Sequence, residues 1–220
     1  MKVKVSHKWD IDKNQAEEIQ NKLKDKIIIN PISKEIKTIC GIDSDYKEEK
    51  IQTCAVICNF PDIEVIEILK IEGKTKFPYI PGFLAFREGE NIIKLIEKIE
   101  KDIDCFIFDG HGIAHPKKFG IASHIGVLIE KPTIGCAKSL LFGNYSKPPS
   151  FPLSSTFIKD NEGEIIGHVL RNYKGGLIFI SPGNLIDLKD TLSITIKCMR
   201  EEYPIPYPLY LAHKNSKFSN

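Results

Sequence analysis

The sequence has no large excess of charge of either sign, and it contains very few arginines. Its 220 residues carry 31 Lys+Arg against 29 Asp+Glu, a formal net charge of +2 that excludes a polycationic protein. Only Arg87, Arg171 and Arg200 are arginine. The positive charge therefore lies mostly on lysine, which suits contacts to phosphates more than readout of bases. Any nucleic-acid binding must use a local basic face.

The sequence also lacks a C-x-x-C pair, an apolar signal core and an apolar stretch of membrane-spanning length. The six cysteines lie mostly in apolar runs and are Cys40, Cys54, Cys58, Cys105, Cys136 and Cys198. Their spacings do not match those of a zinc site. We therefore expect reduced, buried thiols and a cytoplasmic protein with no membrane partner.

The alternation of apolar runs and helical patterns predicts one α/β domain over residues 1–220, because no repeat, low-complexity tract or linker interrupts it. Helices are expected over 10–26, with Asp10 as N-cap, and over 84–101, 121–129 and 188–202. Strands are expected over 38–45, 51–60, 63–71, 105–108, 133–137, 155–159, 165–171 and 177–180. The first three are expected to form an antiparallel unit. The result is a mixed sheet covered by helices. Residues 203–216 are expected to form a segment stiffened by prolines, which carries His213.

The stretch 105–126, CFIFDGHGIAHPKKFGIASHIG, contains an apolar run that ends abruptly on Asp109. Such a run predicts a buried central strand that is followed by a loop. Open α/β sheets place ligands at the carboxyl ends of their strands, where Asp109 would lie. Gly110 and Gly112 allow close backbone approach there, and three histidines, at 111, 115 and 124, crowd the same loop. The alternative is a capping Asp followed by an ordinary turn.

A second carboxylate, Asp43, interrupts the apolar strand 38–45. An ionised carboxylate that is buried without a partner is costly, so both aspartates need compensation. If the two strands are neighbours, the carboxylates converge on a site with the oxygen ligands that Mg²⁺ uses. Glu88, in the first turn of its helix, could complete that site. His213 could supply a proton or bind a second metal, and Lys138 could hold a phosphate or the leaving oxygen.

Together, these carboxylates, the histidine and the lysine indicate metal-assisted hydrolysis of a phosphodiester. Aspartates at strand ends also occur in proteins without a cofactor, so this chemistry does not follow from the aspartates alone.

The loop KTKFPYIPGFLAFREG at 74–89 is stiffened by two prolines. We expect it to expose Phe77, Tyr79, Ile80 and Phe83. These side chains either pack on the core or form a wedge that enters a base stack, as apolar side chains do in proteins that kink DNA.

Five segments together resemble the endonuclease V family of deoxyinosine-specific repair nucleases: GIDSDY (41–46), PYIPGFLAFREG (78–89), DGHGIAHPKKFGIASHIGVL (109–128), PTIGCAKSLLFG (132–143) and SPGNLIDL (181–188). The resemblance covers the chain from about residue 38 to His213. It implies a ribonuclease-H-like fold and cleavage of the second phosphodiester bond on the 3′ side of the lesion, which leaves a 3′-hydroxyl and a 5′-phosphate. It also implies Mg²⁺ or Mn²⁺ as cofactor and deoxyinosine-containing DNA as substrate.

The resemblance carries over to single residues. It implies Asp43, Asp109 and Glu88 as metal-associated carboxylates, His213 as a catalytic histidine and Lys138 as a lysine near the scissile phosphate. It implies a wedge that fills the gap left by the displaced base, made by Pro78, Tyr79, Ile80 and Pro81. It implies a pocket for hypoxanthine, built largely from backbone groups, at Gly82, Leu84, Gly110, Gly112, His115 and Ile121.

Three positions depart from the family pattern. Asp45 adds a carboxylate close to Asp43, and strand alternation places both on one face, opposite Ser44. Tyr210 stands where an arginine is common, and Asn184 where a histidine is frequent. Two rival functions stay open, namely an endonuclease for inosine in RNA and a lesion-binding module without catalysis. We expect a monomer in either case.

Overall fold

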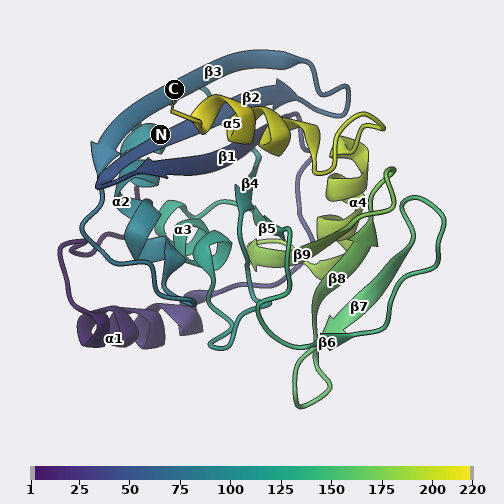
Figure 1. The fold of residues 1–220 in the computed structure, drawn as a ribbon, viewed down its shortest axis with the longest axis horizontal. Helices are drawn as coiled ribbons and strands as arrows, with labels where there is room; N and C mark the ends of the chain where they lie inside the picture. The colour runs from purple at the N-terminus through teal and green to yellow at the C-terminus, as the bar shows by residue number, and fades with distance from the viewer. Residues whose placement is uncertain (1–2, 219–220) are drawn as a thin grey trace.

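The computed structural model describes residues 3–218; the four terminal residues of the predicted domain, 1–2 and 219–220, lie outside the described residues. A nine-stranded sheet runs through it in the order β3-β2-β1-β4-β5-β9-β8-β7-β6 (Figure 1). The strands are β1 (Thr38–Lys47), β2 (Lys50–Asn59), β3 (Val65–Lys74), β4 (Cys105–Asp109), β5 (Thr133–Ala137), β6 (Asn144–Tyr145), β7 (Ser155–Lys159), β8 (Ile165–Arg171) and β9 (Leu177–Asn184). The helices are α1 (Lys13–Leu23), the 3₁₀ turn η1 (Lys24–Lys26), α2 (Leu84–Glu97), α3 (Ile121–Ile129), α4 (Leu188–Cys198) and α5 (Tyr207–Ser216).

The sheet is mixed. Strand β4 pairs in parallel with β1 on one side and β5 on the other, and the remaining pairs are antiparallel. The predicted α/β fold, a ribonuclease-H-like mixed sheet flanked by helices, is confirmed.

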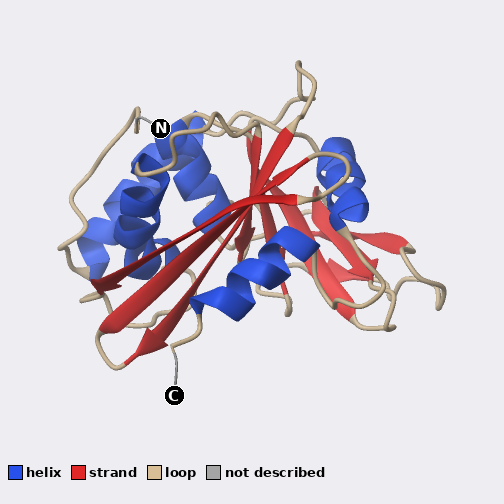
Figure 2. Ribbon diagram, turned by 90° about the horizontal axis from the view of Figure 1, so that it is seen from above, coloured by secondary structure: helices blue, strands red, loops and turns tan. Residues whose placement is uncertain are grey.

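Helices cover both faces of the sheet, with α2 and α3 on one face and α4 and α5 on the other (Figure 2). Strand alternation explains the two layers. Along β4, Phe106 and Phe108 pack with α2 and α3, while Cys105 and Ile107 pack with α4 and α5. Asp109 continues the second series, so its side chain belongs to the α5 face of the sheet.

The segment around His213 was predicted to be stiffened by prolines, but residues 207–216 form helix α5. Pro208 is compatible with this helix because it sits in the first turn, where a backbone N–H would have no partner. The helix lies directly on β1: a Cβ added to Gly41 would stand 2.4 Å from Pro208 C and 2.5 Å from Leu209 N. Glycine at position 41 therefore allows α5 to approach the sheet.

Several other helices and strands begin or end at residues that differ from the predicted ones. The first helix begins at Lys13 and not after Asp10, because Asp12 and Gln15 form a capping box, while Asp10 pairs with Lys76. Helix α2 stops at Glu97, four residues earlier than predicted, and α4 stops at Cys198. Strand β9 continues past its predicted end at residue 180 to Asn184, and the short strand β6 lies between the predicted strands 133–137 and 155–159.

All six cysteines are buried free thiols, as predicted. Within residues 3–218, no helix has both the length and the apolar character needed to cross a membrane.

Candidate active site

The aspartates of two neighbouring strands meet at one edge of the sheet. Ile42 of β1 is paired with Phe108 of β4, and Asp43 and Asp109 follow these residues on parallel strands. Ligand atoms of Asp43, Asp109 and His213 all lie within 4.8 Å of one another. The two carboxylates thus converge because their strands are neighbours, as the sequence predicted.

Helix α5 adds two donors to Asp43. His213 donates from Nδ1 to Asp43 Oδ2 at 2.8 Å, and Ser216 Oγ donates to the same oxygen at 3.1 Å. Because a carboxylate only accepts, the proton of the neutral His213 ring lies on Nδ1. The second oxygen of Asp43, Oδ1, has no partner among the described residues and is left for another ligand.

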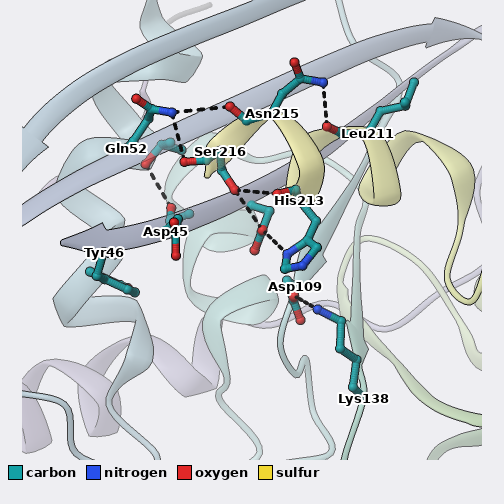
Figure 3. A network of polar contacts seen from close by, with 12 residues as sticks. Asp45, Tyr46, Gln52, Asp109, Lys138, Leu211, His213, Asn215 and Ser216 are labelled. Atoms are coloured by element: carbon teal, nitrogen blue, oxygen red, sulfur yellow. Dashed lines mark hydrogen bonds and ion pairs between the residues drawn. The ribbon is translucent and has the colours of Figure 1, made fainter. Parts of the chain in front are cut away.

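Asp109 is balanced by a cation from the next strand. Lys138, directly after β5, places its Nζ 2.9 Å from Asp109 Oδ2 (Figure 3). Burial, and after it the charge of Asp43, raises the pKa of Asp109, while Lys138 and His213 act in the opposite direction. The site therefore holds two carboxylates that need positive charge in order to be ionised together.

Glu88 is the third carboxylate at the cleft, although it does not share the 4.8 Å cluster. It was predicted in the first turn of its helix, which is wrong, because α2 begins at Leu84 and its first turn has no acidic residue. Tyr46 of β1 donates its hydroxyl hydrogen bond to Glu88 Oε1. Burial, with the charges of Asp43 and Asp109, raises the pKa of Glu88 to about 8 against the hydrogen bonds from Tyr46 and Ser44.

A cleft of about 410 Å³ opens beside these carboxylates. Its lining includes Asp43, Glu88, Asp109 and Lys138, the predicted wedge residues Tyr79, Ile80 and Pro81, and the predicted pocket residues Gly82, Leu84, Gly110, His115 and Ile121. Among the described residues, Pro78, Gly112 and His213 are predicted site residues that do not line it. Gly112 packs instead against β9, where an added Cβ would stand 1.9 Å from Pro182 O.

The loop between β3 and α2 divides into buried and exposed side chains. Phe77 and Phe83 are 5% and 7% exposed and belong to a small core cluster, whereas Tyr79 is 69% exposed. The expectation that all four apolar side chains of this loop are exposed is therefore wrong for the two phenylalanines. Tyr79 stands free at the mouth of the cleft.

The end of this loop is fixed at one carbonyl. Gly82 O accepts from Gln20 Nε2 at 2.8 Å and from His115 Nε2 at 3.0 Å. The N–H of Lys117 donates to Nδ1 of His115, which fixes the neutral ring with its proton on Nε2. Burial accordingly lowers the pKa of His115 to about 4.

Comparison with known proteins decides the family. The sequence model of endonuclease V matches residues 21–214. The endonuclease V of Thermosipho melanesiensis is 43% identical over 218 residues, which cover 99% of this chain and 95% of the relative. This chain belongs to the endonuclease V family. Its members are endonucleases, which hydrolyse phosphodiester bonds, and so is this chain.

Solved structures of endonuclease V share the whole fold. The Bacillus subtilis protein has a TM-score of 0.92 at 35% identity and covers 98% of this chain and 95% of its own. The Ciona intestinalis protein, in complex with a 24mer DNA containing an inosine followed by a ribo-adenosine, has a TM-score of 0.81 at 27% identity and covers 93% and 97%.

The three departures from the endonuclease V pattern lie outside the cleft. Asp45 lies on the same face of β1 as Asp43, as alternation predicted, and its Oδ2 accepts from Phe218 N at 3.3 Å. The Tyr210 ring lies 4.4 Å from that of Tyr203. Asn184 joins two distant segments, accepting from Ile28 N and donating to Gly126 O, both at 3.0 Å. In the described residues, all three positions thus make structural contacts.

Several residues of the site carried no sequence argument of their own. Tyr46 stood inside GIDSDY without an assigned role, and Arg87, whose guanidinium lies 4.4 Å above the Tyr46 ring, was only counted as a charge. Gln52 and Ser216 are separated from their partners by more than 160 positions, and no local pattern could have indicated them.

Proposed function

We propose that this chain is a metal-dependent endonuclease of DNA repair that recognises deoxyinosine and hydrolyses the second phosphodiester bond on the 3′ side of the lesion. The products would be a 3′-hydroxyl and a 5′-phosphate. The observation that carries this proposal is the meeting of Asp43, Asp109 and His213 beside a cleft of about 410 Å³. The inosine-containing DNA bound by the Ciona intestinalis protein supports the choice of substrate.

Mg²⁺, with Mn²⁺ as a substitute, is the proposed cofactor. The donor set fits such an ion, because carboxylate oxygens are its preferred ligands and the mutual repulsion of Asp43 and Asp109 favours a cation. Asp43 and Asp109 would hold it, with Glu88 at the adjacent wall of the cleft. A bound divalent cation supplies a Lewis acid for phosphodiester hydrolysis.

The remaining polar side chains act on protons and charge. His213 is held through Nδ1, so its Nε2 is the atom that exchanges a proton with water or the leaving oxygen. Lys138, half-exposed on Asp109, is placed to hold a phosphate oxygen when the substrate enters.

The loop 78–81 is the proposed wedge and the cleft beneath it the proposed hypoxanthine pocket. Pro78 and Pro81 stiffen the loop, and Tyr79 with Ile80 would stack in the space that the displaced base leaves. Gly82, Leu84, Gly110, His115 and Ile121 would surround the extruded base. Gly112 would support this wall through its contact with β9. A pocket with fixed donors and acceptors rejects other bases, because an unpaired buried polar group costs about 1–3 kcal/mol.

A nicking assay with purified protein and an end-labelled duplex that carries one deoxyinosine tests the proposal. We expect a single cut at the second phosphodiester bond 3′ to the inosine in Mg²⁺ or Mn²⁺, no cut with a chelator and no cut in a matched deoxyguanosine duplex. Binding without any cut in either metal would contradict the proposal and support a lesion-binding module.

Inosine in RNA is a second candidate substrate, because the Ciona intestinalis complex contains a ribonucleotide directly after the inosine. A duplex with one ribonucleotide at that position distinguishes the two. A DNA enzyme should cut both duplexes at similar rates, whereas an RNA enzyme should require the 2′-hydroxyl.

A further inference from the structure

Helix α5 carries His213, and its two ends are held by different means. Its first turn rests on the backbone of β1 at Gly41. Its last turn is held by polar side chains from β1 and β2 (Figure 3). The position of His213 on Asp43 therefore depends on what fixes the C-terminal end of the helix.

Gln52 of β2 binds the carbonyl groups at that end. Its Nε2 lies 2.9 Å from Ser216 O, 3.1 Å from Lys217 O and 3.3 Å from Asn215 O. The last carbonyls of a helix have no partner inside the helix, so a donor from outside stabilises the final turn. One amide group from a different strand thus takes up consecutive carbonyls that follow His213.

Asp45 complements Gln52 from the neighbouring strand. The two residues stand directly opposite each other in the β1–β2 register. Asp45 Oδ2 accepts from Phe218 N at 3.3 Å while Gln52 donates to the carbonyls just before it. The pair therefore binds the chain after α5 with one acceptor and one donor.

Ser216 connects the Gln52–Asp45 pair to Asp43 and His213. Its Oγ donates to Asp43 Oδ2 at 3.1 Å, the oxygen that also accepts from His213, and it lies 3.1 Å from His213 O. The side chain of Ser216 is buried, and its carbonyl oxygen is the nearest of the three that Gln52 Nε2 binds. A shift of the helix end would move both donors on Asp43 together.

We infer that Gln52 and Ser216, assisted by Asp45, are positioning residues that keep His213 on Asp43. None of the three is proposed to touch the substrate; they act through the His213–Asp43 pair. The inference rests on the proposed role of His213, and it assigns a role to Asp45, the carboxylate that departs from the family pattern.

The first test needs no DNA. Long-range ¹H–¹⁵N spectra of ¹⁵N-histidine protein at about pH 8, where histidines are neutral, report the tautomer of each ring. His213→Ala assigns the His213 signals, which we expect in the Nδ1–H form. Gln52→Ala and Ser216→Ala should convert them to a mixture of tautomers, while Asn215→Ala, which removes only a bond to Leu211 O within α5, should leave them unchanged. Unchanged His213 signals in both Gln52→Ala and Ser216→Ala would overturn the inference.

The second test uses single-turnover cleavage of the deoxyinosine duplex. Gln52→Ala and Ser216→Ala should lower the rate constant about tenfold, as misplacement of a reacting group does, with Kd for the duplex within about twofold of wild type. Asn215→Ala should keep both constants. Asp45→Asn retains an acceptor and should keep the rate, whereas Asp45→Ala should lower it. Equal losses in Asn215→Ala, or losses of duplex affinity instead of rate, would indicate general fraying of α5 and contradict the inference. If the wild type cuts nothing, the proposed function fails, and the tautomer measurement still decides this inference.

Discussion

Two histidines of this chain, His213 and His124, show how surroundings set what one residue type does. His213 is 35% exposed, bonds to a carboxylate and sits at the edge of the sheet near Lys138. His124, on α3, is fully buried among the rings of Trp9, Phe86 and Phe119. Its Nε2 lies 2.7 Å from His7 Nε2, and its Nδ1 has no partner among the described residues. A carboxylate partner and solvent access suit a proton-transfer role, whereas an apolar enclosure keeps the ring neutral and packed.

The regions around the two histidines differ in the same way, with carboxylates around His213 and aromatic rings around His124. At the cleft, several carboxylates lie close together and make only a few hydrogen bonds. A single substitution there should therefore affect catalysis more than the free energy of unfolding. In the aromatic cluster, packing dominates, so a change should affect stability more than chemistry. The predictions below test this division from the largest expected effect to the smallest.

The largest effect is expected for Asp109→Ala. This change removes one of the two carboxylates that would hold the cation, and we expect cleavage of the deoxyinosine duplex to fall by about 10³-fold or more, a loss typical of removing a main electrostatic group. Gel-shift binding of the same duplex should survive. Asp102→Ala, an exposed carboxylate beyond the opposite end of β4, is the control and should cut normally. Unimpaired cleavage by Asp109→Ala would remove the metal-site argument.

Gly41→Ala should damage stability and chemistry together. The new methyl group would meet the α5 backbone at 2.4–2.5 Å, so the helix must move and carry His213 with it. We expect a loss of about 1–3 kcal/mol in the free energy of unfolding, measured in urea, together with slower cleavage. At Gly163→Asn nothing lies within 4 Å of the added Cβ, although φ is +86°, so we expect a smaller loss of stability and unchanged cleavage. Full activity of Gly41→Ala would mean that α5 does not set the chemistry.

Tyr79→Ala should weaken binding without affecting the fold. The side chain is 69% exposed, so the free energy of unfolding should change by less than about 0.5 kcal/mol. Kd for the deoxyinosine duplex should rise by about tenfold, since stacking on a base contributes about 1–3 kcal/mol. Phe83→Ala, in the buried part of the same loop, should instead lower Tm. A large drop in Tm for Tyr79→Ala would show that Tyr79 belongs to the core.

The smallest effect is expected from pH acting on the aromatic cluster. Burial, with a smaller contribution from His7, lowers the pKa of His124 well below 6.5, and burial also lowers that of His7. The unfolded chain therefore takes up protons first, so stability is present above about pH 6.5 and is lost as the pH falls below it. In His124→Phe, the free energy of unfolding should depend less on pH between about 6.5 and 5. An unchanged pH dependence of the free energy of unfolding would mean that groups other than His124 take up the protons.

The sequence predicted most closely those elements whose boundaries are marked by local chemistry. Residues 121–129, 133–137, 155–159 and 165–171 form the predicted elements with the predicted ends. Asp43 and Asp109 could be selected because a carboxylate in an apolar strand is unusual. Glu88 was assigned to the wrong turn although the helix starts at residue 84 as predicted, because residue 88 is its fifth residue and a turn holds about 3.6 residues.

Other features depend on contacts between distant segments, which local patterns do not contain. The prolines of 203–216 suggested a stiff segment, yet α5 forms because Gly41 lets it pack on β1. The bonds of Gln52 and Ser216 join β1 and β2 to the end of the chain. His124 was grouped with His111 and His115 by sequence, but α3 turns it into the core while the other two line the cleft.

The central claim is that Asp43 and Asp109 together hold one divalent cation beside the cleft. Titration of the protein with Mn²⁺, followed by electron paramagnetic resonance of the free ion, tests it directly in wild type, Asp43→Asn and Asp109→Asn, with Asp102→Asn as control. The account predicts Mn²⁺ binding by wild type and Asp102→Asn that is lost in both of the other variants. Equal Mn²⁺ affinity in all four proteins would contradict it.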